Sequence, residues 1–483
     1  MNGAWRGSAW PQLGGARAST LGQLGTKPLA SCLAAVMLFV TSCDNEVNSA
    51  TEEEPTTPGP EVLEGLDDPV VVNFWHSMDG TAGNALGELV ETFNERNEDR
   101  IRVEASFQGT EDDTLANYRA ALQQNATPQV AMIHELGTQF MIDSADAVPV
   151  QDFMDRDDFD AGELEESLLS YFTVNNELRA LPFAHSTPML YLNTEAFTEA
   201  GLDPENPPGD LAELQDAAQA LTLADNGQVE QYGFGAALSG WYVEQFLARA
   251  ETPFCTQDNG RSGRADAALL DDPAVVEVIE WWSEIIEEDH SPQLGRNIED
   301  SRTAFTTERV AMTLESSQAL PTLMDDSDFE VATAPFPVPH ADDPGGSTID
   351  GSALWISRDG HSEREQRAAW EFLRFLLEPS AQEQWHAATG YLALNSFAYE
   401  LPQARERAED FPQFAAAAHQ VADASADSAA TGCVMGAMFE ARAAVEDGWE
   451  RAVTEDEDPE EAMTNAAETA QEAIDEYNEA VTG

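Results

Sequence analysis

The residues that most resemble the start of a catalytic motif are His134 and Glu135, because His-Glu opens the helical motif of many zinc hydrolases. That motif needs a second histidine at its fifth position, where this chain has Thr138, so zinc-dependent hydrolysis is excluded. No Walker A loop, dinucleotide glycine fingerprint, CxxC pair or serine nucleophile elbow is present, and the eight histidines lack metal-ligand spacing. We therefore expect no metal and no cofactor. The missing motifs are only weak evidence against an enzyme, because the paired carboxylates of glycosidases have no local signature.

Cys43 is the residue whose position predicts a covalent modification. Lys27 precedes an apolar stretch at 29–40, and small residues at 41–42 lead into the cysteine. This is the pattern of a secretory signal, and twelve apolar residues are too few to cross a bilayer. A cysteine at this point resembles the lipobox of bacterial lipoproteins, whose thiol is acylated. We expect residues 1–42 to be a signal peptide and Cys43 to hold the chain on a membrane by a lipid, in the periplasm or at the cell surface.

The composition of the next segment predicts a tether. Residues 43–67 contain three prolines, several acidic residues and no basic residue. Such a composition cannot bury enough apolar surface to fold. Two cysteines remain beyond it, Cys255 and Cys433. Outside the cytoplasm a disulfide between them is permitted, and two free thiols are the open alternative.

The charge balance excludes whole classes of partner. The chain has 23 basic and 90 acidic residues, a formal net charge of −67 at pH 7. A surface of this kind repels nucleic acid and anionic lipid head groups, so neither is an expected partner. Its self-repulsion is tolerable where abundant salt shortens the Debye length. We interpret it as adaptation of an exported protein to a saline medium, with an ordinary acidic protein as the alternative.

The elements that must position any site begin at Asp68, where strand-like and helix-like segments start to alternate. Three segments have the pattern of strands, at 70–75, 101–106 and 130–133, and helical spacing separates them at 86–93 and 115–122. This order predicts a parallel sheet with right-handed crossovers, and thus an α/β fold. Further on, Ser362 and Glu365 form a capping box for a helix that Pro379 ends.

Four segments together resemble the glycerol-3-phosphate-binding branch of the extracellular solute-binding proteins that serve bacterial ABC importers. They are FWHSMDG at 74–80, HSTPMLYLNTEAFTEAGLDPENP at 185–207, GSALW at 351–355 and WHAATGYL at 385–392. The resemblance runs from about Val70 to the C-terminus. It implies a monomer that binds a small organophosphate and delivers it to ABC permease subunits.

The resemblance also implies a fold, which is the two-lobed periplasmic-binding-protein-like α/β fold of type II, with crossing hinge strands between the lobes. The first lobe would consist of residues 68–184 with about 350–396, and the second of 187–348 with about 397–483. The crossings would fall near 184–187 and 349–352, and the ligand would lie in the cleft between the lobes.

The family's ligand contacts fall on six residues of this chain. They are Glu135, Ser186, Ser316, Gly351, Tyr391 and Arg442. Arg442 offers a permanently charged planar fork for a phosphate, and the two serines and backbone N–H groups at Gly351 are further donors. Glu135 would accept from glycerol hydroxyls, while Tyr391 would pack on the carbon chain or donate its hydroxyl. The plain alternatives are a surface ion pair for Arg442, a turn at Ser186, a strand bend at Gly351 and a core position for Tyr391.

Two departures from the family pattern bear on the ligand. Glu111 stands where the family has a tyrosine, and Leu238 stands where the first of two tryptophans is expected, with Trp241 in the place of the second. An added carboxylate disfavours a dianionic phosphomonoester and favours a cationic head group. We therefore expect a glycerophosphodiester such as glycerophosphocholine, with its ammonium near Glu111 or Glu135 and Trp241. An oligosaccharide-binding protein and an extracellular hydrolase are the competing interpretations.

Overall fold

The larger of two principal sheets contains the strands expected from the sequence. The computed structural model describes residues 57–424 and 427–482, so the expected signal peptide and Cys43 lie outside the described residues. Strands β1 (Val70–His76), β2 (Ile101–Phe107) and β3 (Val130–His134) are parallel, and α1 (Gly80–Arg96) and α2 (Glu111–Leu122) connect them. Strand β13 (Asp350–Ser357) runs antiparallel to β3, β4 (Ala147–Val148) and β7 (Leu181–Ser186). The α/β fold is therefore confirmed.

The second principal sheet follows after a single intervening residue. Strand β8 (Pro188–Asn193) begins just past β7, and it pairs antiparallel with β11 (Met312–Ser316) on one side and β12 (Val331–Pro335) on the other. Every residue of β8 and β11 is buried. The chain thus passes from one sheet to the other at Thr187 and returns to the larger sheet at Asp350.

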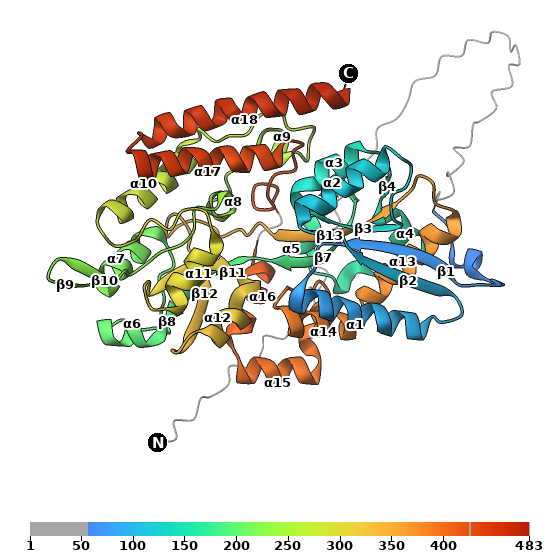
Figure 1. The fold of residues 1–483 in the computed structure, drawn as a ribbon, viewed down its shortest axis with the longest axis horizontal. Coiled ribbons are helices and arrows are strands. Elements are labelled where there is room, and N and C mark those ends of the chain that lie inside the picture. Colours follow the sequence, from blue (N-terminus) through green and yellow to red (C-terminus); the bar gives the residue numbers. More distant parts are fainter. Residues whose placement is uncertain (1–56, 425–426, 483) are drawn as a thin grey trace, which may run out of the picture. The chain divides into compact units, whose positions relative to one another are not determined.

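The two principal sheets lie in two lobes (Figure 1), and two clusters of buried apolar side chains form the core. The first cluster contains Trp355 and Trp370 around the larger sheet, a part that we call the first lobe, and it continues into the smaller sheet through Met189 and Tyr191. The second contains Trp282 and Trp449, whose rings meet edge to face at 4.6 Å, and we call it the second lobe. Its main helices are α8 (Gly240–Arg249), α10 (Pro273–Glu287), α17 (Met438–Glu455) and α18 (Pro459–Thr482).

The remaining elements connect and cover these parts. The other helices are α3 (Thr138–Asp143), α4 (Val150–Arg156), α5 (Glu166–Phe172), α6 (Thr194–Ala200), α7 (Leu211–Leu221), α9 (Thr256–Asn259), α11 (Ile298–Thr306), α12 (Leu320–Asp326), α13 (Glu363–Leu376), α14 (Pro379–Thr389), α15 (Pro402–Asp410) and α16 (Gln413–Ala422). The 3-10 turns are η1 (Pro60–Leu63), η2 (Glu135–Gly137), η3 (Ala161–Glu163), η4 (Ser317–Ala319) and η5 (Ser396–Glu400). Two small hairpins consist of β5 (Thr173–Val174) with β6 (Glu177–Leu178), and β9 (Leu223–Asp225) with β10 (Gln228–Gln231).

The end of the expected tether is folded, which corrects one expectation. Leu63 is buried in the core of the first lobe, and η1 packs against α13. Thr57 donates to the backbone of Asp152 at 3.0 Å, and Arg364 donates to the carbonyl of Val62 at 3.1 Å. The prediction that residues 43–67 do not pack is therefore wrong for 57–63. Val62 and Leu63 of the segment pack against the core of the first lobe, and Arg364 elsewhere in the chain donates to its backbone.

Cys255 and Cys433 form a disulfide, with Cα atoms 5.9 Å apart and 178 residues apart in the sequence. It joins the start of α9 to the loop before α17, so it closes a long loop within the second lobe. Within 57–424 and 427–482, no helix is both long enough and apolar enough to cross a membrane.

Candidate functional site

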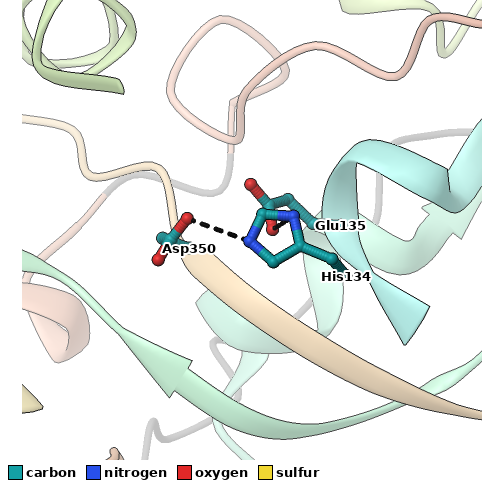
Figure 2. Close-up of side chains that lie close together, drawn as sticks. All are labelled: His134, Glu135 and Asp350. Carbon is teal, nitrogen blue, oxygen red and sulfur yellow. Dashed lines mark ion pairs between the residues drawn. The ribbon is translucent and has the colours of Figure 1, made fainter. Parts of the chain in front are cut away.

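Charged side chains from four elements of the first lobe meet at one edge of the larger sheet. His134 ends β3 and Glu135 follows it in η2, at the carboxyl end of the parallel strands where ligands bind in open α/β sheets. Because β13 is antiparallel to β3, its first residue, Asp350, reaches the same edge. Glu111 arrives from the first turn of α2. Figure 2 shows the imidazole of His134 with Asp350 and Glu135 on either side of it.

His134 bridges the carboxylates of this cluster. Its Nδ1 lies 2.7 Å from Glu135 Oε2, and its Nε2 lies 3.2 Å from Glu111 Oε2 and 3.3 Å from Asp350 Oδ1. Burial lowers the pKa of His134, but the surrounding carboxylates outweigh burial and hold that pKa well above its usual value. His134, Glu135 and Asp350 are also a group whose donor atoms lie within 4.8 Å of one another, as a metal site would need. Carboxylates at both ring nitrogens favour the imidazolium, which pairs with them by charge. A metal ion would need the neutral imidazole and would have to displace that proton.

Arg442 brings the second lobe into the same cluster. From α17 it donates to both oxygens of Glu244, from Nε at 2.7 Å and from Nη2 at 3.1 Å. Nη2 also donates to Glu135 Oε1 at 3.2 Å, and Nη1 lies 3.9 Å from Asp350 Oδ1. Burial lowers the pKa of Arg442, but Glu244 and Glu135 hold it above its usual value. The side chain is 13% exposed, so it is not the surface ion pair of the alternative interpretation.

Carboxylates outnumber cationic groups around this point. Two cations, Arg442 and His134, face four carboxylates, namely Glu111, Glu135, Glu244 and Asp350. Glu135 and Glu244 are buried, while the side chains of Glu111 and Asp350 are 39% and 30% exposed. The two accessible carboxylates are thus the ones that an incoming cationic group can reach.

Gly351 and Ser352 fix two of these carboxylates. The N–H of Gly351 donates to Glu135 Oε2 at 3.1 Å, and the hydroxyl of Ser352 donates to Glu111 Oε1 at 3.1 Å. Gly351 has φ +135°, and a Cβ there would lie 1.8 Å from the carbonyl oxygen of Ala184. Only glycine fits this close crossing of β13 and β7. Its N–H, expected to serve a phosphate, is occupied by Glu135 in this structure.

Tyr391 lies beside the accessible carboxylates. Its ring stacks on Trp385 with centroids 5.6 Å apart and planes at 3°. Burial raises the pKa of the Tyr391 hydroxyl, and the nearby charges of Glu111 and Asp350 raise it further. The stacked ring, next to two carboxylates, is an arrangement that favours a cation.

The other expected residues lie at the ends of β7 and β11 and on or just before α8. Ser186 ends β7 directly opposite Asp350, and Ser316 ends β11, where its Oγ accepts from the backbone N–H of Gln318. Trp241 lies on α8 next to Gly240, whose backbone lies against the Arg442 side chain. Leu238 is in the apolar core of the second lobe.

Residues 88–416 match the family of bacterial extracellular solute-binding proteins, which covers more than half of the chain. The chain belongs to that family. It is therefore an extracellular solute-binding protein and not an enzyme.

Curated relatives cover most of this solute-binding protein. The sn-glycerol-3-phosphate-binding periplasmic protein UgpB of Yersinia pestis is 29% identical over 416 residues, which is 85% of this chain and 93% of the relative. The protein of the same name from Escherichia coli K12 is 28% identical over 410 residues, 83% of this chain and 92% of the relative.

Solved structures confirm the two-lobed fold. UgpB from Mycobacterium tuberculosis in complex with glycerophosphocholine superimposes with a TM-score of 0.70 at 20% identity, over 85% of this chain and 99% of the other. A cyclic α-maltosyl-1,6-maltose binding protein from Arthrobacter globiformis gives a TM-score of 0.68 at 23% identity, over 84% and 100%.

Three members of the charged cluster were not found from the sequence of this solute-binding protein. They are His134 as a cation, Glu244 and Asp350. Each is close in sequence to an expected residue, since Glu244 follows Trp241 by three positions on one helix and Asp350 precedes Gly351. Those spacings are the only signal available, because nothing local marks one acid among 90 as buried.

A second contact between the lobes lies away from this cluster. Asp143, at the end of α3 in the first lobe, accepts from both Nη atoms of Arg264 at 2.7 and 2.6 Å. It also accepts from the hydroxyl of Tyr477 on α18 at 2.9 Å. The Asp143 side chain is 10% exposed and also accepts from Gln139 of its own helix at 3.0 Å, while Arg264 of the second lobe supplies the opposite charge.

We expect Asp143→Asn to weaken ligand binding about tenfold, because it removes charge from a bidentate contact that favours approach of the lobes. Titration calorimetry on both proteins measures this. Asp155→Asn, which neutralises an exposed acid in α4 of the first lobe, is the matched control and should leave affinity unchanged. Equal affinities of the Asp143→Asn variant and the wild type would contradict the assignment.

Proposed function

We propose that this solute-binding protein serves an ABC importer and captures a glycerophosphodiester with a cationic head group, such as glycerophosphocholine, around Arg442. The observation that carries the proposal is the adjacency of a donor-rich region to an excess of carboxylates at the meeting point of the two lobes. A ligand with one negative and one positive group matches both.

The donor-rich region suits a phosphate. Arg442 Nη1 lies 3.9 Å from Asp350, beyond hydrogen-bond distance, so its two N–H groups are free to donate to a ligand. The indole N–H of Trp241 is buried and finds no acceptor among the described residues. A buried donor without an acceptor is costly, and phosphate oxygens would satisfy it.

The carboxylate-rich region suits an ammonium group. Glu111 and Asp350 are the partly exposed members of the cluster, and the ring of Tyr391 adjoins them. Burying negative charge without compensation is costly, and a ligand cation would supply the compensation. The relatives that bind sn-glycerol 3-phosphate support a glycerol phosphate as the ligand, and the glycerophosphocholine-bound structure supports the phosphodiester.

Titration calorimetry with glycerophosphocholine and sn-glycerol 3-phosphate tests this function. We expect glycerophosphocholine to bind at least about tenfold more tightly, because only it brings a cation to Glu111 and Asp350. Tighter binding of glycerol 3-phosphate would overturn the choice of ligand.

An oligosaccharide is the second candidate, because structurally similar proteins bind maltose-based sugars and acarbose. Neutral sugars need aromatic platforms and no buried arginine, whereas Arg442 is largely buried among carboxylates. Maltotriose and cyclic maltosyl sugars in the same calorimeter distinguish the two. Binding of a sugar without binding of either phosphate ester would replace the proposal.

Lipid anchoring through Cys43 is part of the proposal. We expect Cys43→Ser to move the protein from the membrane fraction to the soluble fraction and to abolish incorporation of a fatty-acid label, because the thiol is the acylation point. Retention of the variant on the membrane would contradict it.

A further inference from the structure

Glu244 accepts two hydrogen bonds from the Nε–Nη2 edge of the Arg442 guanidinium. Without Glu244, this edge could donate two parallel hydrogen bonds to an anion. Glu244 lies on α8, its side chain is 5% exposed, and its two oxygens accept from Nε at 2.7 Å and from Nη2 at 3.1 Å. Burial raises the pKa of Glu244, but both of its oxygens accept hydrogen bonds from the guanidinium of Arg442, which favours the ionised carboxylate. The paired-donor edge of Arg442, which gives arginine its strong grip on a phosphate, is therefore filled by the protein itself.

Few N–H donors of Arg442 remain for a ligand. The second N–H of Arg442 Nη2 donates to Glu135 at 3.2 Å, which leaves only Nη1. A ligand phosphate must also approach four carboxylates with two cations among them. At an effective dielectric constant of about 20, one extra negative charge within about 7 Å of a like charge weakens binding by roughly 10- to 100-fold. A phosphate with one negative charge is repelled by the carboxylates once, and a phosphate with two negative charges is weakened by the same factor a second time.

We propose that Glu244 is a specificity-determining residue that restricts the site to phosphate esters with a single negative charge. This inference rests on the proposed function, since it concerns the phosphate of the ligand. It differs from the cation preference attributed to Glu111 and Asp350, because it acts on the anionic group and applies to esters with no cationic part.

The test uses two esters that differ in one charge and carry no cation, sn-glycerol 3-phosphate and its methyl phosphodiester, at pH 8. The wild type should bind the diester at least about tenfold more tightly than the monoester. Glu244→Gln keeps an acceptor for Arg442 Nε but removes the charge, so it should narrow this ratio about tenfold. Glu440→Gln, which removes an exposed acid from the helix of Arg442, is the matched control and should keep the wild-type ratio.

The outcomes separate the explanations. If Glu244 only positions Arg442, Glu244→Gln will weaken both esters by the same factor and the ratio will stay constant, which overturns the proposal. Tight binding of the monoester by the wild type overturns it too, even if the variant does not fold. Glu244→Asp, which keeps the charge, should keep the preference for the diester. Binding of neither ester overturns this inference alone if glycerophosphocholine still binds, and overturns it together with the proposed function if glycerophosphocholine fails to bind as well. Equal binding of both esters overturns this inference alone.

Discussion

Arg442→Ala is expected to lower the affinity for glycerophosphocholine about a thousandfold. The change removes the guanidinium whose Nη1 faces the ligand, leaves Glu244 without its cation and leaves Glu135 with His134 alone. Truncating one partner of a buried, hydrogen-bonded charge pair costs about 2–5 kcal/mol in binding, here because the phosphate would face carboxylates without the guanidinium. Titration calorimetry measures the affinity. Because both carboxylates are buried, the variant should also be less stable, which denaturant unfolding would detect.

Arg451→Ala is the matched control for that experiment. Arg451 lies on the same helix and pairs with Glu457, and its side chain is 33% exposed. Its removal takes the same charge from α17 at an exposed position, where an ion pair contributes little. Arg451→Ala should therefore bind the ligand as the wild type does. If Arg442→Ala kept its affinity within a few-fold, the phosphate assignment would be wrong.

His134→Gln should have the largest effect on stability. The imidazolium lies between Glu135, Glu111 and Asp350, and its side chain is only 9% exposed. Glutamine retains hydrogen-bonding capacity but not charge, so three carboxylates would face one another with Arg442 as the remaining cation. We expect the free energy of unfolding, measured by urea unfolding at pH 6, to fall by roughly 3 kcal/mol or more.

The pH dependence of the unfolding free energy of the same variant tests whether His134 is charged. The pKa of His134 is raised in the folded protein, so the folded state binds this proton more tightly than the unfolded chain. The stability that it contributes is complete below pH about 6.5 and is lost as the pH rises through the folded-state pKa. Stability of the wild type should thus fall above neutral pH, and His134→Gln should lack that part of the slope. His340→Gln, at an exposed pair with Glu277, is the control. Equal slopes for the wild type and His134→Gln would show that His134 is not charged.

The regular elements could be predicted because their signals are local. Strands expected at 70–75, 101–106 and 130–133 are observed at 70–76, 101–107 and 130–134. The capping box of Ser362 and Glu365 begins α13 as expected, and Gly390, in a left-handed conformation, ends α14. Periodicity and caps involve neighbours a few positions apart, so one sequence contains them. The packing of 57–63 was missed because its partners lie about 100 to 300 residues away.

The sequence alone predicts the α/β class, the two-lobed fold through the family resemblance, and candidate ligand contacts that include Glu111, Glu135, Tyr391 and Arg442. The pairing of the charged side chains becomes visible only in the folded structure. The contact between Arg442 and Glu135 joins residues 307 positions apart, and the contact between Arg442 and Glu244 joins residues 198 apart. With 90 acids in the chain, composition cannot show which few are withdrawn from water and held against a guanidinium. Burial and distance decide that: the contact with Glu244 arises when the second lobe folds, and the contact with Glu135 arises when the two lobes meet.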